Sequence, residues 1–276
     1  MKNLKNILVL LFLIATALTG CIPEEPAGGT SLAVHFIDVG QGDAILIDIG
    51  ETEVLIDGGS KSSGAADYIS DYVNGPLEAM VATHTHADHI GGLPEVLDSF
   101  EVQEVWLNGD TSTSQTFTDF MDSVNAEGAT IREVERGESI PVGALTFFIL
   151  NPEKPLSTDT NNNSIVLSLS YGEIDFLFTG DAEQEAEATM LGLLSDIEIL
   201  KVGHHGSNTA SSPDFLNITK PDVAIYMAGV GNTYHHPHQE TIDALNAIGA
   251  QIYGTDTSGT IIVTTDGETY SVQTSK

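Results

Sequence analysis

The amino-acid sequence predicts an α/β protein in which β-sheets are covered by helices. Hydrophobic residues make up 41% of its 276 residues and charged residues 18%, a composition typical of folded chains. Short runs dense in Val, Ile and Leu are bounded by Gly and Asp, as buried strands usually are. Segments with helical spacing of apolar residues alternate with these runs, which favours layers of both kinds.

The first half of the chain begins with strands and then alternates. Strands are expected at 32–39, 44–49, 54–56, 77–82 and 102–107, because each is an apolar run closed by turn-forming residues. Helices are expected at 65–73, 94–100 and 116–126. The last of these has the clearest pattern, since its apolar residues recur at the spacing of one helical face: Phe117, Phe120, Met121 and Val124.

The second half repeats the mixture. Strands are expected at 145–150, 165–169, 174–178, 197–202, 223–227, 251–254 and 261–264. A helix rich in Glu and Ala is expected at 182–194, and another at 241–248.

The net charge is strongly negative. The chain has 9 Lys and Arg against 40 Asp and Glu, which gives a formal net charge of −31. Proteins that read nucleic acids need Lys and Arg to displace the counterions of the phosphate backbone. We therefore expect no stable nucleic-acid complex, although an enzyme can still engage such a polymer through metal ions. Acidity of this size also favours solubility.

The first 21 residues have the order of a secretory signal. Lys2 and Lys5 give a basic start, residues 7–18 are almost wholly apolar, and Leu-Thr-Gly-Cys ends at Cys21. The apolar run is shorter than the roughly 20 residues of an ordinary membrane span. The last four residues resemble the lipobox of exported lipoproteins, whose cysteine is lipidated and becomes the mature N-terminus. A plain cleaved signal and an uncleaved anchor are the alternatives.

The position of Cys21 also limits other chemistry. It is the only cysteine, so an internal disulfide and a thiolate metal cluster are excluded. Residues 22–31 contain two prolines and two glycines and read as a flexible tether. The globular domain is then expected at 32–276. We expect the mature protein to be exported and held by its lipid at the extracytoplasmic face of the cell membrane.

The chemistry concentrates in histidine, and eight of nine histidines fall in three clusters. The first cluster, THTHADH at 83–89, directly follows the strand at 77–82. Alternation along an extended chain places His84, His86 and Asp88 on one side, and His89 joins them if a helix begins near Ala87. Imidazole and carboxylate donors suit a divalent metal of the zinc class. Four donors are too many for one tetrahedral ion with an open position, so two metals are expected.

The other two clusters leave alternatives open. His204 and His205 follow the strand at 197–202, and neighbours on a strand end point to opposite sides. We therefore favour His205 as a direct ligand and His204 as a residue that orients substrate or a ligand, although looped geometry would reverse this choice. The third cluster, YHHPH at 234–238, predicts substrate binding or proton transfer, further metal binding, or a surface loop at a helix start.

Several motifs together resemble a known family. His-x-His-x-Asp-His at 84–89 resembles the signature of the metallo-β-lactamase fold. Further motifs are similar to those of the hydrolase domain of ComEC-type competence proteins: FIDVGQGDA at 36–44, LIDGG at 55–59, NNNSIVL at 161–167, FTGD at 178–181, LKVGHHGS at 200–207, HPH at 236–238 and TD at 255–256. The resemblance covers nearly all of the chain after the tether. The many membrane spans of ComEC proteins are not part of the match, so the resemblance is to their hydrolase domain alone.

The resemblance implies a fold and a set of metal ligands. The fold is an αββα sandwich with metals at one edge of two facing sheets. His84 and His86 bind one metal, Asp88 and His89 bind the other, and Asp181 bridges both. From the residues alone, Asp181 has a second interpretation as the N-cap of the helix at 182–194.

One ligand of the wider fold is missing. Relatives often have a histidine between the first cluster and the bridging aspartate, whereas this chain has none between His89 and His204. Residues 161–164 occupy that region, so one metal is expected to be short of a protein ligand. For His236 and His238, the resemblance suggests substrate binding or proton transfer.

Further residues are expected near the site. Asp57 ends a strand before two glycines and is expected to hold a ligand histidine by its N–H. Asp38 and Asp43 flank a Gly-Gln-Gly turn, and turn chemistry accounts for them as readily as a role in the site. His35 stands apart and is taken as structural. The residues expected to bind substrate or support the ligands are Asp57, Asn161, Ser164, Lys201, Ser207 and His238.

These residues predict metal-assisted hydrolysis. Two ions, Zn or alternatively Mn, lie roughly 3.5–4 Å apart in such sites and lower the pKa of a shared water towards 7. The expected catalytic residues are His204, His236 and Asp88. A small or polymeric phosphodiester is the favoured substrate, because two-metal sites suit in-line phosphoryl displacement. The alternatives are hydrolysis of another ester, a thioester or a lactam on the same fold, or a non-catalytic metal-binding surface lipoprotein.

Overall fold

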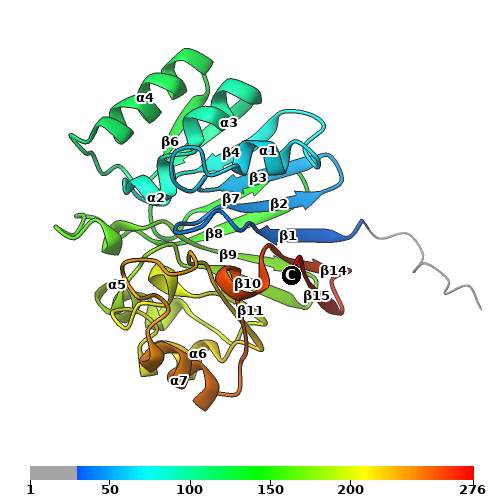
Figure 1. Ribbon diagram of the computed structural model, residues 1–276, viewed down its shortest axis with the longest axis vertical. Helices are drawn as coiled ribbons and strands as arrows, with labels where there is room; N and C mark the ends of the chain where they lie inside the picture. The colour runs from blue at the N-terminus through cyan, green and yellow to red at the C-terminus, as the bar shows by residue number, and fades with distance from the viewer. Residues whose placement is uncertain (1–29) are drawn as a thin grey trace, which may run out of the picture.

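The computed structural model describes residues 30–276 (Figure 1). The predicted signal, the lipobox with Cys21 and most of the predicted tether lie outside the described residues. The first strand begins at Leu32. Within the described range, no helix combines the length and apolar character needed to cross a bilayer.

The elements alternate between strands and short helices. The strands are β1 Leu32–Phe36, β2 Ile45–Ile49, β3 Thr52–Ile56, β4 Leu77–Val81, β5 Val102–Leu107, β6 Thr130–Glu133, β7 Ser139–Val142, β8 Leu145–Asn151, β9 Val166–Tyr171, β10 Ile174–Phe178, β11 Ile199–Lys201, β12 Val223–Tyr226, β13 Gln251–Gly254, β14 Ile261–Thr265 and β15 Tyr270–Thr274. The helices are α1 Ala65–Ile69, α2 Ala87–Ile90, α3 Leu93–Ser99, α4 Gln115–Glu127, α5 Gln184–Met190, α6 Pro213–Thr219, α7 Gln239–Ala247 and α8 Thr255–Ser258, with 3-10 turns η1 Asn161–Asn163, η2 Leu191–Leu193 and η3 Gly203–Gly206.

Two mixed sheets form the centre of the molecule. The first has eight strands in the order β15-β14-β1-β2-β3-β4-β5-β6, and the second has seven in the order β13-β12-β11-β10-β9-β8-β7. Side chains of both sheets share one large apolar cluster that includes Phe36, Trp106 and Phe176. Although β14 and β15 come last in the chain, they extend the first sheet beyond β1 (Figure 1): β14 pairs with β1, where Phe36 lies opposite Ile261, and β15 pairs with β14.

Helices cover the outer face of each sheet. On the first sheet, α1, α3 and α4 pack through a second apolar cluster that includes Ile69, Leu93 and Phe120. On the second sheet, α5, α6 and α7 pack through a third cluster that includes Met190 and Phe215. Figure 1 shows the resulting order of helices, sheet, sheet and helices. The predicted α/β class and αββα sandwich are confirmed.

The sheet topology brings the motif-bearing loops to one edge. Strands β3, β4 and β5 run parallel, and so do β10, β11 and β12. The carboxyl ends of parallel strands meet at the same edge of a sheet, so the loops that follow them lie together. Strand β1 ends at the same edge as β3, because both run antiparallel to β2. These loops contain Asp43, Asp57, His84, His86, Asp88, His89, Asp181, His204 and His205.

Candidate metal centre

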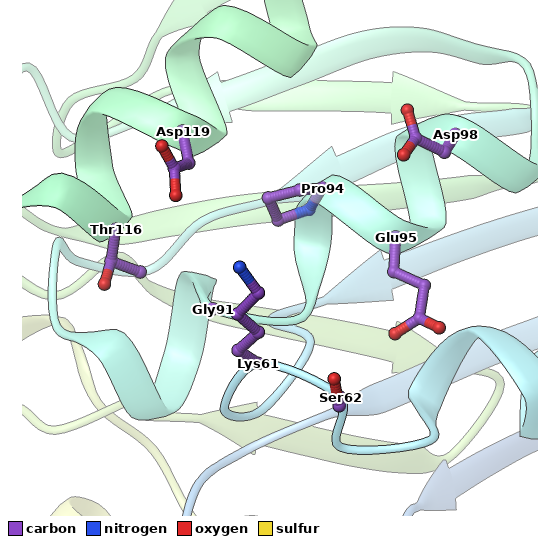
Figure 2. Close-up of a pocket in the computed structure, with 8 residues that line it drawn as sticks. All are labelled: Lys61, Ser62, Gly91, Pro94, Glu95, Asp98, Thr116 and Asp119. Carbon is purple, nitrogen blue, oxygen red and sulfur yellow. The ribbon is translucent and has the colours of Figure 1, made fainter.

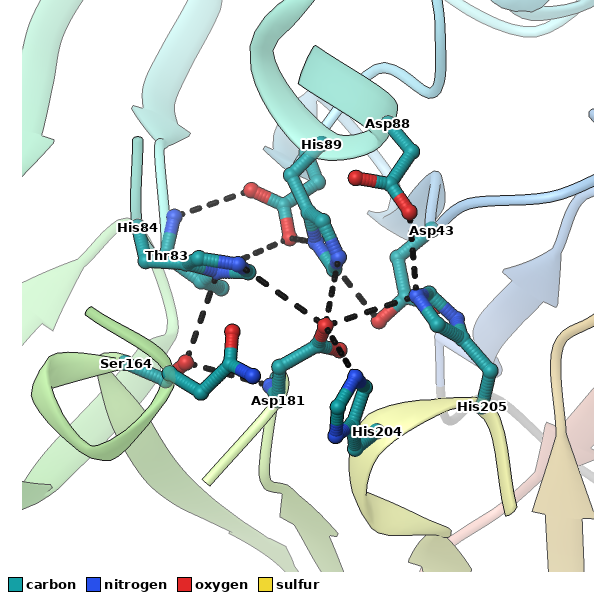
Figure 3. Close-up of polar contacts among 12 residues, drawn as sticks. Asp43, Thr83, His84, Asp88, His89, Ser164, Asp181, His204 and His205 are labelled. Atoms are coloured by element: carbon teal, nitrogen blue, oxygen red, sulfur yellow. Dashed lines mark hydrogen bonds and ion pairs between the residues drawn. The ribbon is translucent and has the colours of Figure 1, made fainter. Parts of the chain in front are cut away.

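Histidines and an aspartate from three other segments, which follow β1, β4 and β11, gather around Asp181. Ligand atoms of His84, His86 and Asp181 lie within 4.8 Å of one another, and so do those of Asp43, His89, Asp181 and His205. Asp181 belongs to both groups. Figure 3 shows its carboxylate facing His89 and His205, with Oδ2 at 3.2 and 3.4 Å from their Nε2 atoms. The two groups therefore share one carboxylate, which is the arrangement of a two-metal site.

The first histidine cluster is split between a bend and a helix. Helix α2 begins at Ala87, as the sequence analysis required for His89 to join its neighbours. His84 and His89 are buried, whereas His86 is exposed at the mouth of the site. Asp88 belongs to neither group of convergent ligands, but its Oδ2 lies 3.3 Å from Nε2 of His205. The segment is bent rather than extended, so simple alternation does not describe it.

Three buried imidazoles each have one nitrogen held by a hydrogen bond. Nδ1 of His89 donates to Oδ2 of Asp57 at 2.8 Å, and Nδ1 of His205 donates to the Met227 carbonyl at 2.9 Å. Nδ1 of His84 lies 3.1 Å from Oγ1 of Thr83, whose own proton goes to Asp57. These partners keep the proton on Nδ1, so that each ring, once neutral, presents an Nε2 lone pair to the site.

Atoms that lack partners show what the site is built to hold. Nε2 of His84, His89 and His205 is buried and has no hydrogen-bond partner, and the same holds for Asp181 Oδ1 and Asp43 Oδ1. Buried polar atoms without partners are costly and uncommon. Imidazole nitrogens and carboxylate oxygens that converge in this way fit divalent cations of the Zn and Mn class. The residues present therefore fit two metal ions.

Charges within the site are strongly coupled. Burial opposes protonation of His89, but Asp181 and Asp57 hold its pKa well above the ordinary value. Burial opposes protonation of His205 as well, yet Asp181 and Asp43 raise its pKa well above that value. These two histidines thus supply positive charge against the carboxylates. Metals bind neutral imidazole, so metal binding would release these protons.

The structure corrects the expectation that His204 and His205 diverge from a strand end. Both lie in the 3-10 turn η3, with φ angles of 46° and 54°, a left-handed conformation that few residues other than glycine adopt. Both rings therefore face Asp181, and Nε2 of His204 lies 3.7 Å from its Oδ2. They differ in burial, because His205 is 1% exposed while the His204 side chain is 22% exposed. Nδ1 of His204 contacts Oε1 of Glu183 at 2.9 Å.

The structure decides between the interpretations of Asp181 and Asp43. Helix α5 begins at Gln184 with Glu183 as its N-cap, so Asp181 is not a helix cap. Asp43 is more than a turn residue, because its carboxylate belongs to the ligand group of His89 and His205. Gly42 makes this possible: a Cβ there would lie 2.1 Å from the Asp88 carbonyl oxygen, and the Asp43 amide donates to that same oxygen at 3.2 Å.

The residues expected to contact substrate fall mostly behind the ligands. Lys201 is buried, and its Nζ pairs with Asp43 and donates to the Gly180 carbonyl at 3.1 Å. Ser207 is buried against Oγ1 of Thr209, and Nδ1 of His238 accepts from the Asn208 amide. These three side chains support loops or ligands and do not line the cavity described next.

Of residues 161–164, which occupy the place of the missing histidine, Ser164 contacts the metal ligands and Asn161 does not. Ser164 contacts the ligands: its Oγ accepts from the Asp181 amide at 3.1 Å and lies 3.4 Å from Nδ1 of His84. Asn161 belongs to η1, and its backbone carbonyl accepts a hydrogen bond from the Ser164 amide. Its side chain is absent from the cavity wall. The first ligand group accordingly contains three residues, which leaves a metal there with room for a further ligand.

A cavity of about 330 Å³ opens onto the metal centre. Its wall consists of Gln41, His86, Ala87, Asp88, Asp181, His204, His205, Tyr234 and His236. Burial, with the charges of His204 and His205, lowers the pKa of His236 to about 4. The ring of His236 lies 5.3 Å from that of His204, and the third cluster contributes to this cavity through Tyr234 and His236.

Two further residues at the site, Gln41 and Glu183, were not expected there from the sequence. The Gly229 amide donates to Oε1 of Gln41 at 3.3 Å, which fixes the side-chain amide so that Nε2 is left as the free donor. That Nε2 atom is buried without a partner, like the histidine nitrogens of the ligand groups. A Cβ on Gly229 would lie 2.7 Å from the Gln41 backbone nitrogen, so a glycine is needed for this contact. The only available signal was the Gly-Gln-Gly turn beside Asp43.

A second cavity lies on the outer helices of the first sheet. It measures about 290 Å³ and is lined by Lys61, Ser62, Gly91, Pro94, Glu95, Asp98, Thr116 and Asp119. Glu95 and Asp98 come from α3 and Asp119 from α4, and Figure 2 shows the Lys61 side chain between these two helices. Within residues 30–276, none of these carboxylates belongs to a group of convergent metal ligands.

Comparisons with known proteins agree with this geometry. The metallo-beta-lactamase superfamily matches residues 37–230. ComE operon protein 3 of Bacillus subtilis is 31% identical over 250 residues, which are 83% of this chain and 32% of that protein. Recombination protein 2 of Haemophilus influenzae is 30% identical and also matches 83% of this chain, but 28% of its own length. The chain thus spans about a third of the length of the curated relatives it matches.

A solved structure agrees at the level of the fold. The metallo-beta-lactamase fold protein YhfI from Bacillus subtilis superposes with a TM-score of 0.60 and 11% identity, and the match covers 86% of this chain and 100% of that one. The sheets, the shared Asp181 and the family match over most of the chain lead to one conclusion. The chain belongs to the metallo-beta-lactamase superfamily of metal-dependent hydrolases and has relatives among the competence proteins.

Proposed function

We propose that this protein is a binuclear metal-dependent phosphodiesterase, exported and anchored to the cell membrane by a lipid. The observation that carries the catalytic part is the sharing of Asp181 by two groups of ligands. Paired ions bridged by a carboxylate suit in-line displacement at phosphorus, because they neutralise charge on both the attacking and the leaving oxygen.

The ligand assignment follows the two groups. His84, His86 and Asp181 hold one ion, and Asp181 with Asp43, His89 and His205 holds the other. Zinc is the favoured metal and Mn the alternative, since both accept imidazole and carboxylate donors. When bound, the metals supply Lewis acidity and a water of lowered pKa. Asp88, beside His205, is an ionised carboxylate: burial opposes its charge, but the nearby His205 and His89 lower its pKa.

Residues of the cavity wall supply the remaining chemistry. In hydrolysis, a water oxygen bonds to phosphorus and gives a proton to the ionised Asp88 carboxylate in the cavity wall, while the bond to the leaving oxygen breaks. His204 is placed to protonate that leaving oxygen, because its ring is partly exposed in the cavity and Glu183 holds its other nitrogen. His236, whose lowered pKa keeps it neutral at pH 7, lies against His204 and positions it. Gln41 can donate from Nε2 to a non-bridging phosphoryl oxygen.

The net charge of the chain and the names of its relatives together favour one class of phosphodiester substrate. A recombination protein and competence proteins are among the relatives, which favours a phosphodiester of the nucleic-acid type. The net charge of −31 argues against long, tightly held polymers. A short or single-stranded substrate that engages the ions directly fits both observations.

The proposed location rests on the sequence of residues 1–21. The basic start, the short apolar run and Cys21 match an exported lipoprotein. Cys21→Ser should abolish the lipid mass and either leave the protein uncleaved at the lipobox or release it from membranes as soluble protein. Equal membrane attachment of wild type and variant, with no lipid detected on either, would contradict the anchor.

The activity is tested with the full-length protein in detergent, loaded with Zn or Mn. We expect hydrolysis of bis-p-nitrophenyl phosphate, two metals per chain, and loss of most turnover in Asp181→Ala. A chromogenic lactam and a thioester serve as comparison substrates. Turnover of the lactam or thioester alone would reassign the substrate class. Two bound metals without turnover of any ester would favour a non-catalytic binding protein.

A further inference from the structure

An exposed aromatic ring stands at the rim of the metal-site cavity. Of the large hydrophobic side chains in residues 30–276, four are strongly exposed, and two of these, Val230 and Tyr234, lie in the loop between β12 and α7. Tyr234 is 61% exposed. It lines the cavity together with Asp181 and His204. A ring that projects beside the ligand groups is available to a bound substrate.

The loop that carries Tyr234 is held rigidly. The Asn232 side chain accepts from the amides of Tyr234 at 3.1 Å and His236 at 3.0 Å, and it donates to the carbonyls of His236 and Gly229. The Tyr234 ring stacks on the His236 ring, with centroids 5.7 Å apart and an angle of 24° between planes. One face of the tyrosine is therefore covered by a buried histidine, and its orientation is set before substrate arrives.

The cavity has little else with which to hold an anionic substrate. Its wall contains no Lys or Arg. Lys201, which contacts the ligand Asp43, is buried and paired with that carboxylate. Affinity beyond the ions must then come from uncharged contacts. Stacking of a planar group on an aromatic ring is such a contact, and for nucleobases it contributes about 1–3 kcal/mol.

We propose that Tyr234 is a specificity residue that stacks on a planar aromatic group of the substrate, a nucleobase next to the scissile phosphodiester. This inference rests on the proposed phosphodiesterase activity. Bases inside a duplex are already stacked, so the ring serves an unpaired base. The hydroxyl group is not required, since the contact is made by the face of the ring.

The test compares two substrates that differ only in the bases. Dithymidine monophosphate and its abasic analogue share the sugar and phosphodiester. Tyr234→Ala should lower kcat/KM for the dinucleotide about 5–150-fold, the change that corresponds to 1–3 kcal/mol, and leave the abasic analogue unchanged. Tyr234→Phe should retain wild-type values on both. Val230→Ala, in the same loop, is the matched control and should also behave as wild type.

The possible outcomes separate the two proposals. Metal content and melting temperature are measured for each variant, so that a disturbed loop is recognised. Equal losses on both substrates in Tyr234→Ala would show a structural role and overturn the stacking proposal, and so would equal wild-type rates on the two substrates. If the wild-type protein hydrolyses no phosphodiester at all, bis-p-nitrophenyl phosphate included, the proposed function fails and this inference fails with it.

Discussion

Asp57→Asn tests whether metal binding depends on the tautomer of His89. The Asp57 carboxylate is buried and accepts from the Thr83 amide at 2.8 Å through Oδ1. Through Oδ2 it accepts from Oγ1 of Thr83 at 2.7 Å and from Nδ1 of His89 at 2.8 Å. In the variant, the Asn oxygen must stay on the Thr83 amide, so its NH₂ group faces His89. Nδ1 then has to accept, and the ring proton moves to Nε2, the atom that faces Asp181.

The expected loss follows from that exchange. A hydrogen bond to a charged group contributes about 1.5–3 kcal/mol, and loss of such a support typically weakens metal binding about 10–100-fold. We expect this weakening for the ion at His89. We also expect it for the ion at His84 and His86, because the NH₂ group would face Oγ1 of Thr83 as well, and this hydroxyl would then have to donate to Nδ1 of His84. The backbone should tolerate the change, because Asp57 has a φ of 58° and Asn is among the residues that adopt this conformation most readily.

The assay is competition for Zn against a chelating dye, fitted with two sites. Nitrogen-15 spectra of the imidazole rings report the tautomer directly. Asp67→Asn, an exposed carboxylate on α1, is the matched control. The reasoning is refuted if Asp57→Asn binds both ions as tightly as the wild type, or if affinity falls while the spectra show an unchanged Nδ1–H tautomer.

Three other perturbations test separate parts of the structure. His205→Ala should reduce metal content from two ions towards one by native mass spectrometry, whereas His204→Ala should keep both and lower kcat; the reverse result would exchange their roles. Gln41→Met should lower kcat/KM about 10²–10³-fold and reduce discrimination between phosphorothioate diastereomers of the substrate, since one non-bridging oxygen loses its donor; an unchanged preference would contradict that contact. The pKa of Glu53 is raised to about 7 by burial and by the nearby carboxylates of Glu78, Asp48 and Glu51. The folded protein therefore binds a proton that the unfolded chain releases, and wild-type stability falls as the pH rises from the ordinary carboxyl pKa to 7. Glu53→Gln should therefore gain about 1–2 kcal/mol at pH 8 and almost nothing at pH 4.5, and an equal gain at both pH values in denaturant unfolding would argue against it.

Apolar density in the sequence was enough to predict the central elements of the fold. Strands β5, β10 and β13 have the predicted bounds: β10 is largely buried, β5 is partly buried, and the edge strand β13 is closed by Gly254. The strands that were missed lie at or near sheet edges: β6 is mostly exposed, β7 contains Pro141, and β15 is exposed along most of its length. Edge strands need apolar residues on fewer positions, so their patterns are weak. Helix α6 was also missed, although Ser212 and Pro213 mark its start.

The sequence by itself determined the chemistry of the site, whereas the tertiary structure decided which residues belong to it. The spacing of His84 to His89 at a strand end is local, and so it predicted metal ligands and the start of α2 without knowledge of the rest of the chain. Asp43, Gln41 and Glu183 lie among turn and helix residues with ordinary local explanations. They enter the site only because parallel strands of two sheets end at one edge. The directions of His204 and His205 depended on a left-handed turn, which no alternation rule describes.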